Sequence, residues 1–417
     1  MWRLFVMYIK ESIPINTVHS HSSTTIDISQ LTDVSGVIRN YLQTTFRPFS
    51  ENYLQRLQQN SAHSIFNNLY SSYLASVSPS YFATSPMDIY YNESLLKEQL
   101  ASPKANLNHP IIDQLWFTIS ATKLELHRLS DLVKQRQYSA FCELHSHSPK
   151  NARGRLEIEV YEHCLHFKFS AQKDHRIVVY HGLRGVSGRQ NPIKVAFNPA
   201  RFTLAEIKAF FTWIRKGEVF DDFVTTMSKS NVTRLDIATD FIGISTPMFL
   251  VVNNLSKHTD YEPKKRTKDF QLVQTQVLGE PAQSHYDVYS RNHKLISVAT
   301  AGMLLLNDTG ESIPITRVER CWRPQKSNTP CNLADIVNAP NMLKSLSIYS
   351  PRLLKEIQST GEKIFIATHG FSHWLYSGRE KVCENVLKRE LLFINKTEFG
   401  DMQTKALKVL RKVILGS

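Results

Sequence analysis

The stretch SNVTRLDIATDF, residues 230–241, decides the fold class, because it reads as a buried β-strand that also carries charges. Apolar and charged residues alternate along it, so one face of a sheet would be apolar and the other would hold Arg234, Asp236 and Asp240. Aspartate is depleted from strands, and burying an ionised carboxylate is costly unless it is paired or bound to a metal. Two aspartates on one strand face beside an arginine therefore predict a metal site on a rigid platform.

Two further segments have the same strand pattern and carry reactive side chains. ITRVERCW, residues 315–322, places Glu319 on a second strand. HYDVYSRNHK, residues 285–294, places Tyr286 and Tyr289 on a strand that runs into basic residues. The tyrosines are three residues apart, so they face opposite sides of a regular strand, and either could attack a substrate. Carboxylates on two strands and a tyrosine among cations predict DNA cleavage through a tyrosine.

The surrounding pattern predicts an α+β fold with an antiparallel sheet in its core, residues 109–330. Strands are expected at 111–119, 156–160, 164–169, 176–180 and 193–197, and helices at 121–137 and 204–216, the second capped by Thr203. Residues 247–257 are expected to be helical or irregular. We expect a mostly helical or partly ordered accessory region at 1–108. Residues 331–417 should form a helical, basic C-terminal region that ends in an amphipathic helix at 404–415.

The positive charge of the chain is unevenly distributed. The 417 residues include 50 Lys and Arg against 37 Asp and Glu, a formal excess of +13. Residues 1–108 contain seven of each kind, so the whole excess lies in residues 109–417. Such asymmetry predicts a polyanionic partner. The predicted DNA contacts are Arg234, Arg317, Lys264, Lys265, Arg266 and Lys268. The C-terminal run Lys405, Lys408, Arg411 and Lys412 fits a DNA contact and a solvated helix face equally well.

The sequence predicts a cytoplasmic protein without a membrane span. No run of about 18 apolar residues is present. The apolar run within the first ten residues is too short for a secretory signal, and no small-residue cleavage site follows it directly. The five cysteines are widely scattered without a CxxC pair, which favours a reducing compartment over a disulfide framework.

At its three charged strands the chain resembles the replication initiation factors of rolling-circle plasmids and filamentous phages. That family shows an Arg-Ile-Asp strand, a Tyr-x-Lys strand and an Arg-x-Glu strand in this order. Here the matching residues are Arg234-Leu235-Asp236, Tyr289-Ser290-Arg291 and Arg317-Val318-Glu319. An early aspartate in the first strand, Asp113, and an Asn-Pro turn at Asn198 are also similar, so the resemblance covers residues 109–325.

The resemblance implies a palm-like, antiparallel nuclease core, with an internal duplication left open, and a covalent 5′-phosphotyrosine intermediate. It implies that the protein nicks one strand of a double-stranded, locally single-stranded origin to start rolling-circle replication of a plasmid or phage. The partners would be the origin DNA and a bacterial host's helicase and polymerase, and a dimer is left open. Two positions depart from the family: Arg291 replaces the lysine, and Lys294 stands where an acidic residue is common.

The roles predicted for the site follow from phosphodiester chemistry. Tyr289, assisted by the cations Arg291 and Lys294, is the predicted nucleophile. Mg²⁺ or Mn²⁺ on Asp236 and Glu319, with Asp240 as a third ligand, would neutralise the phosphate and orient the scissile bond. Four residues of strand separate the two aspartates by about 13 Å, so Asp240 is the less secure ligand and instead fits a salt bridge.

Other readings of the same residues stay open. Asp236 and Glu319 could form salt bridges with neighbouring arginines, since ion-pair networks also place charges on strands. A DNA-binding protein of the same fold that does not cleave, a conjugative relaxase and a membrane-surface protein are the alternative functions. The membrane-surface reading leaves the strand motifs unexplained.

Overall fold

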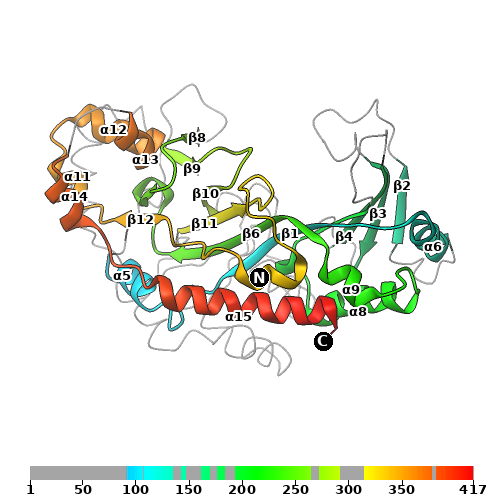
Figure 1. Cartoon of the computed structure of the whole chain (residues 1–417). Helices are drawn as coiled ribbons and strands as arrows, with labels where there is room; N and C mark the ends of the chain where they lie inside the picture. The colour runs from blue at the N-terminus through cyan, green and yellow to red at the C-terminus, as the bar shows by residue number, and fades with distance from the viewer. Residues whose placement is uncertain are drawn as a thin grey trace, which may run out of the picture.

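Ten strands, each antiparallel to its neighbours, form the main sheet of the part of the chain that the structure describes (Figure 1). The structure is a computed structural model, and it describes residues 91, 93–106, 108–134, 142–146, 161–169, 176–183, 193–263, 272–291, 314–377 and 382–416. The α+β class predicted from the sequence is confirmed. The predictions for residues 1–90 and for the strand at 156–160 lie outside the described residues.

The strand order of the main sheet brings distant segments together. In spatial order the strands are β2 (Cys142–Ser146), β3 (Tyr161–Lys168), β4 (Arg176–Leu183), β5 (Ile193–Phe197), β1 (Ile111–Ile119), β6 (Asn231–Ile242), β11 (Ile315–Trp322), β10 (His285–Ser290), β9 (Val273–Leu278) and β8 (Thr259–Pro263). The strands predicted around Asp236, Glu319 and Tyr289 are thus the immediate neighbours β6, β11 and β10. Strands β2, β8 and β9 of this sheet were not predicted.

One face of the sheet is packed against helices. Helix α8 (Leu204–Lys216) places its apolar side on β1 and β3, where the rings of Phe117 and Phe211 lie 6.4 Å apart and those of Phe167 and Phe210 lie 4.9 Å apart. Helices α6 (Lys123–Lys134) and α9 (Phe223–Ser228) complete this layer, and Leu129, Leu132, Phe223 and Met227 from them belong to the same core. Both α6 and α8 lie where the apolar periodicity predicts a helix.

Helix α8 begins with the capping box that the sequence predicts at Thr203. The Thr203 hydroxyl accepts a hydrogen bond from the Glu206 amide, and the Glu206 carboxylate accepts one from the Thr203 amide at 2.7 Å. We expect Thr203→Ala to lower the free energy of unfolding by about 1 kcal/mol, because it leaves amide donors of the first turn without their cap. Urea denaturation would measure the change. Thr203→Ser is the matched control, and an equal loss in both variants would contradict the capping role.

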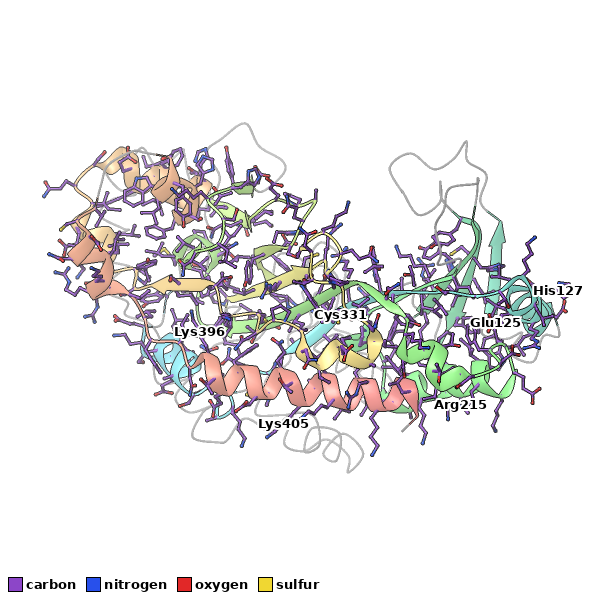
Figure 2. The ribbon with its side chains drawn as sticks, in the orientation of Figure 1. Glu125, His127, Arg215, Cys331, Lys396 and Lys405 are labelled. Carbon is purple, nitrogen blue, oxygen red and sulfur yellow. The ribbon has the colours of Figure 1, made fainter. Side chains whose placement is uncertain are left out.

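Helix α15 (Lys396–Leu415) runs beneath the central part of the sheet (Figure 1). Its N-terminal end is tied to α5 (Glu93–Ala101), because the Asn395 side chain donates to the Ala101 carbonyl at 3.1 Å. Its C-terminal end is tied to α8, where Arg215 donates to the Leu415 carbonyl at 2.6 Å. Figure 2 shows Lys396 and Arg215 at these two ends. The predicted helix at 404–415 is therefore present and begins eight residues earlier.

The rest of residues 331–417 packs on the same core as the sheet. Strand β12 (Leu346–Tyr349) pairs with β7 (Leu250–Asn253) in a second, two-stranded sheet. The remaining described elements are η5 (Pro199–Arg201), η6 (Thr246–Met248), η7 (Leu333–Asn338), α11 (Leu353–Glu356), α12 (Thr360–His369), α13 (Phe371–Tyr376) and α14 (Glu384–Glu390). The segment expected to be helical or irregular at 247–257 thus contains a short strand, whose four residues are too few to show a period. None of the described helices combines the length and the apolar character that a membrane span requires.

Candidate catalytic site

Three charged or reactive side chains from three neighbouring strands lie in one row across the sheet. In register, Asp240 of β6 stands opposite Arg317 of β11, and Arg317 stands opposite Tyr289 of β10. Directly opposed residues share a face of the sheet, so all three side chains are on the same face. Glu319, two residues after Arg317, shares that face. The sheet thus collects the predicted tyrosine and two of the predicted carboxylates on one side.

Tyr289 and Glu319 are joined by a hydrogen bond. The Tyr289 hydroxyl donates to Glu319 Oε2 at 2.9 Å, and both side chains are buried. Burial and the negative charge of Glu319 raise the pKa of Tyr289 well above its ordinary value, while Arg317 and Arg291 oppose that rise. A tyrosine with a high pKa cannot ionise spontaneously at neutral pH. Its proton has an acceptor within reach in Glu319, which is the relation of a nucleophile to its base.

Arg317 is fully enclosed and binds Asp240 with two hydrogen bonds. Its Nε donates to Asp240 Oδ1 at 2.6 Å and its Nη2 donates to Oδ2 at 2.7 Å. Burial alone would raise the pKa of Asp240, but Arg317 and Arg291 outweigh it and hold the pKa below its usual value. Asp240 therefore lies in a buried, bidentate ion pair. This is the salt bridge that the sequence left open as its alternative to a metal ligand.

Arg291 brings a second buried guanidinium to the site. It follows Tyr289 by two residues, its side chain is 4% exposed, and its Nε has no hydrogen-bond partner in the part of the chain that is described. Burial and the neighbouring charge of Arg317 lower the pKa of Arg291 to about 10. A buried guanidinium that repels another cation and keeps an unused donor is suited to receive an anion.

Asp236 is the deepest of the predicted carboxylates and is bound by Arg234. Arg234 Nε lies 2.9 Å and 2.8 Å from the two oxygens of Asp236, which is 0% exposed. Burial raises the pKa of Asp236, and the Arg234 guanidinium opposes this rise. The Arg234 guanidinium also lies over the Trp116 ring, with its Cζ 4.7 Å from the ring centre. Two contacts on different sides fix Arg234 in place.

The three predicted metal ligands do not fit a divalent ion as they are placed. Asp236 accepts from Arg234, Asp240 accepts from Arg317 and Glu319 accepts from Tyr289. Among the described residues, no group of three or more Asp, Glu, His or Cys side chains is close enough to hold a metal ion.

Asp113 joins the site although the sequence assigned it no role there. The pairing of β1 with β6 shifts register between Ile112 and Gln114, so Asp113 is an extra residue at a β-bulge. Its Oδ1 accepts from Asn198 Nδ2 at 2.7 Å, and its Oδ2 lies 4.0 Å from Arg317. Asp113 and Asn198 are the two positions that extended the family resemblance beyond the three strands. That resemblance was the one indication in the sequence that they belong to the site.

Tyr286 lies on the opposite face of β10, as its spacing from Tyr289 predicts. Its hydroxyl donates to the Met342 carbonyl at 2.7 Å and lies 2.7 Å from Ser345 Oγ. Both partners belong to the segment between η7 and β12, so the Tyr286 hydroxyl serves packing. Tyr286 has the Arg320 guanidinium over its ring, 5.6 Å from the ring centre, whereas the Tyr289 hydroxyl is the one that donates to a carboxylate.

The remaining predicted contacts lie outside the described residues or on helix α15. Lys264, Lys265, Arg266, Lys268 and Lys294 lie outside the described residues. Helix α15 lies beneath the face that holds Tyr286, because its Gln403 accepts from the amide of Met342, the residue whose carbonyl accepts from Tyr286.

The sequence was compared with models of protein families and with curated proteins, and neither comparison gave a match.

Proposed function

We propose that the protein starts rolling-circle replication of a plasmid or phage by cutting one strand of its origin through Tyr289. The observation that carries this proposal is the hydrogen bond from the Tyr289 hydroxyl to Glu319, with Arg317 and Arg291 beside it. A buried nucleophile, a base and two cations are what strand transfer to tyrosine requires. The order of the strand motifs along the chain and the basic balance of residues 109–417 add support for a DNA substrate.

The chemistry uses the side chains in separate roles. The Tyr289 oxygen attacks the phosphorus while Glu319 takes up the phenolic proton. The bond from phosphorus to the 3′ oxygen breaks, and this oxygen leaves with a proton from water as a 3′-hydroxyl primer. The 5′ phosphate stays on the tyrosine as a diester. Arg291 would bind a non-bridging oxygen through its unused Nε donor, and the charge of Arg317 beside it would lower the repulsion between the phosphate and the attacking oxygen. Reversal of the same step closes the circle after one round.

The palm-like nuclease core, the bacterial cytoplasm and the host helicase and polymerase belong to the same proposal. They rest on the resemblance of residues 109–325. The antiparallel order of the block β5-β1-β6-β11-β10 supports this part of the proposal, as does the shared face of Asp240, Arg317 and Tyr289.

The proposal is tested by nicking of supercoiled DNA. The full chain is incubated with a plasmid that carries the DNA surrounding its own gene, and the products are separated on native and denaturing gels. The expected products are open circles with protein bound to the 5′ end. The reaction is run with Mg²⁺, Mn²⁺ and EDTA, because the sequence predicts a metal on carboxylates that the structure pairs with other partners. Nicking only with metal would mean that the carboxylates exchange those partners for the ion. Origin binding without a nick in any condition would overturn the proposal.

Replacing Glu319 by glutamine tests the base. Glu319→Gln keeps the size of the side chain but cannot take up the proton of Tyr289. We expect strand cleavage to fall by about 10²- to 10⁴-fold, the usual contribution of a positioned base. Single-turnover nicking across a range of pH measures the loss, and the variant should recover part of its rate at high pH, where hydroxide ionises the phenol. Cleavage at the wild-type rate would show that another group accepts the proton.

One observation favours a protein that binds DNA without cleaving it. The Tyr289 side chain is 5% exposed and its pKa is raised, so the pair with Glu319 also satisfies the demands of a buried, structural hydrogen bond. In that case Glu319→Gln would lower stability and leave DNA binding intact. The nicking assay separates the two functions directly.

A further inference from the structure

A second polar feature lies on strands β4, β5, β1 and β6, and we call it the cation–aromatic row. It consists of Tyr180, Lys194, Trp116 and Arg234, one residue from each strand in that order. Lys194 Nζ lies 4.2 Å from the centre of the Trp116 ring and 5.8 Å from that of Tyr180. Arg234 lies over the same Trp116 ring. Cations and rings therefore alternate across four neighbouring strands.

The row is on the same face of the sheet as Tyr289. Arg234 stands opposite Trp116 in register and binds Asp236, whose position on β6 is four residues before Asp240. Residues an even number apart on a strand share a face, so Arg234, Asp236 and Asp240 connect the row to the catalytic site. At the usual spacing of about 4.8 Å between strands, the five steps from β4 to β10 span about 24 Å.

The two faces of these strands differ in their chemistry. Residues that alternate with the row, such as Leu115, Phe117, Val179 and Val195, are fully buried under α6 and α8. On the face of the row, Trp116 and Tyr180 are half-buried, the Arg234 side chain is 23% exposed, and Lys194 is 9% exposed. Figure 1 shows α8, α9 and α15 together below the sheet, so the described helices of this region lie on the apolar side.

The contacts of the row fix positive charge in place. An ammonium or guanidinium group over an aromatic ring is held in place by its attraction to the ring face. Beyond Tyr180, Arg176 of β4 adds a further guanidinium, whose Nη1 lies 3.0 Å from His166 Nδ1. Preformed cations interleaved with rings are suited to a chain that carries phosphates and flat bases.

We propose that the cation–aromatic row binds single-stranded DNA and leads it to Tyr289. The inference deepens the proposed function, on which it rests. Lys194 contacts a backbone phosphate, and Tyr180 stacks on a base. Stacking of this kind is open only to an unpaired strand, because a duplex hides the faces of its bases. The row thus selects the melted part of the origin over the duplex.

The test measures binding of a fluorescent oligothymidylate to the full chain by anisotropy, at several salt concentrations. Lys194→Met keeps the packing of the side chain against Trp116 and removes its charge. We expect an affinity loss of about three- to tenfold, and a decrease of about 0.7 in the slope of log affinity against log salt, the value for one lost phosphate contact with a single strand. Tyr180→Leu should weaken binding at least about fivefold with the slope unchanged.

Matched controls separate this inference from its rivals. Lys208→Met removes an exposed lysine from α8, which packs on the apolar face of the sheet, and should leave the affinity within about twofold. Affinities of Lys194→Met and Tyr180→Leu that equal that of the wild type would overturn the proposal. So would an equal loss for duplex DNA, or tighter binding of oligouridylate, which would make RNA the ligand. The assay involves no cleavage, so a chain that binds through the row but never nicks would refute the proposed function alone.

Discussion

Tyr289→Phe should abolish strand cleavage, with a loss of at least about 10⁴-fold, because no covalent intermediate can form without the phenolic oxygen. The substitution removes one oxygen atom from a buried side chain and keeps its ring. It also removes the hydrogen bond to Glu319, which costs about 1 kcal/mol of folding stability. The measurement is the fraction of supercoiled plasmid nicked in a single turnover, together with the amount of protein linked to DNA on a denaturing gel.

Tyr286→Phe is the matched control for this experiment. Tyr286 is on the same strand, is equally buried and also loses a hydroxyl with two hydrogen-bond contacts. Because that hydroxyl lies on the other face, we expect nicking to stay within about threefold of the wild-type rate once the fraction of folded protein is matched by circular dichroism. Nicking by Tyr289→Phe at the wild-type rate, or its loss only in Tyr286→Phe, would contradict the assignment.

Part of the candidate site was predictable from the sequence, because the alternation of residues along a strand determines which of them share a face of the sheet. The period of two separates Tyr286 from Tyr289 and places Asp236 and Asp240 on one face, and the structure agrees. This alternation does not show which strands become neighbours in the sheet. The neighbours of β6 are β1 and β11, which are far from it in sequence, so only the structure shows that Asp240, Arg317 and Tyr289 stand side by side.

The partners of the carboxylates were less predictable for an energetic reason. A metal ion and a guanidinium both stabilise a buried carboxylate, and spacing along the chain does not distinguish them. The choice depends on which side chain reaches across the strands, as Arg317 reaches Asp240. Asp113 was missed as a site residue because a β-bulge redirects it, and a bulge leaves no mark in an alternating pattern.

Arg317→Met should destabilise the fold by about 3–5 kcal/mol, the usual cost of leaving one partner of a buried ion pair without the other. The Arg317 side chain is 2% exposed and provides both hydrogen bonds of the bidentate contact with Asp240. Methionine fills much of the same volume, so the loss of stability comes more from the unpaired carboxylate of Asp240 than from a cavity. Urea denaturation at neutral pH measures it. The exposed pair of Lys388 and Glu384 is the control, and Lys388→Met should cost no more than about 0.5 kcal/mol.

The pH dependence tests the cause of this loss. In the wild type the pKa of Asp240 is below its unfolded value of about 3.9, so the stability it contributes is present above that pH and is lost as the pH falls toward the folded pKa. In Arg317→Met the sign reverses, because a buried carboxylate without its guanidinium has a raised pKa and takes up a proton on folding. The stability deficit of the variant should therefore shrink as the pH is lowered from 7 toward 5. Adding Asp240→Asn should remove that pH dependence and restore part of the stability, since an amide can be buried at lower cost than a charge. A deficit that is constant with pH would mean that lost packing, and not the unpaired charge of Asp240, destabilises the variant.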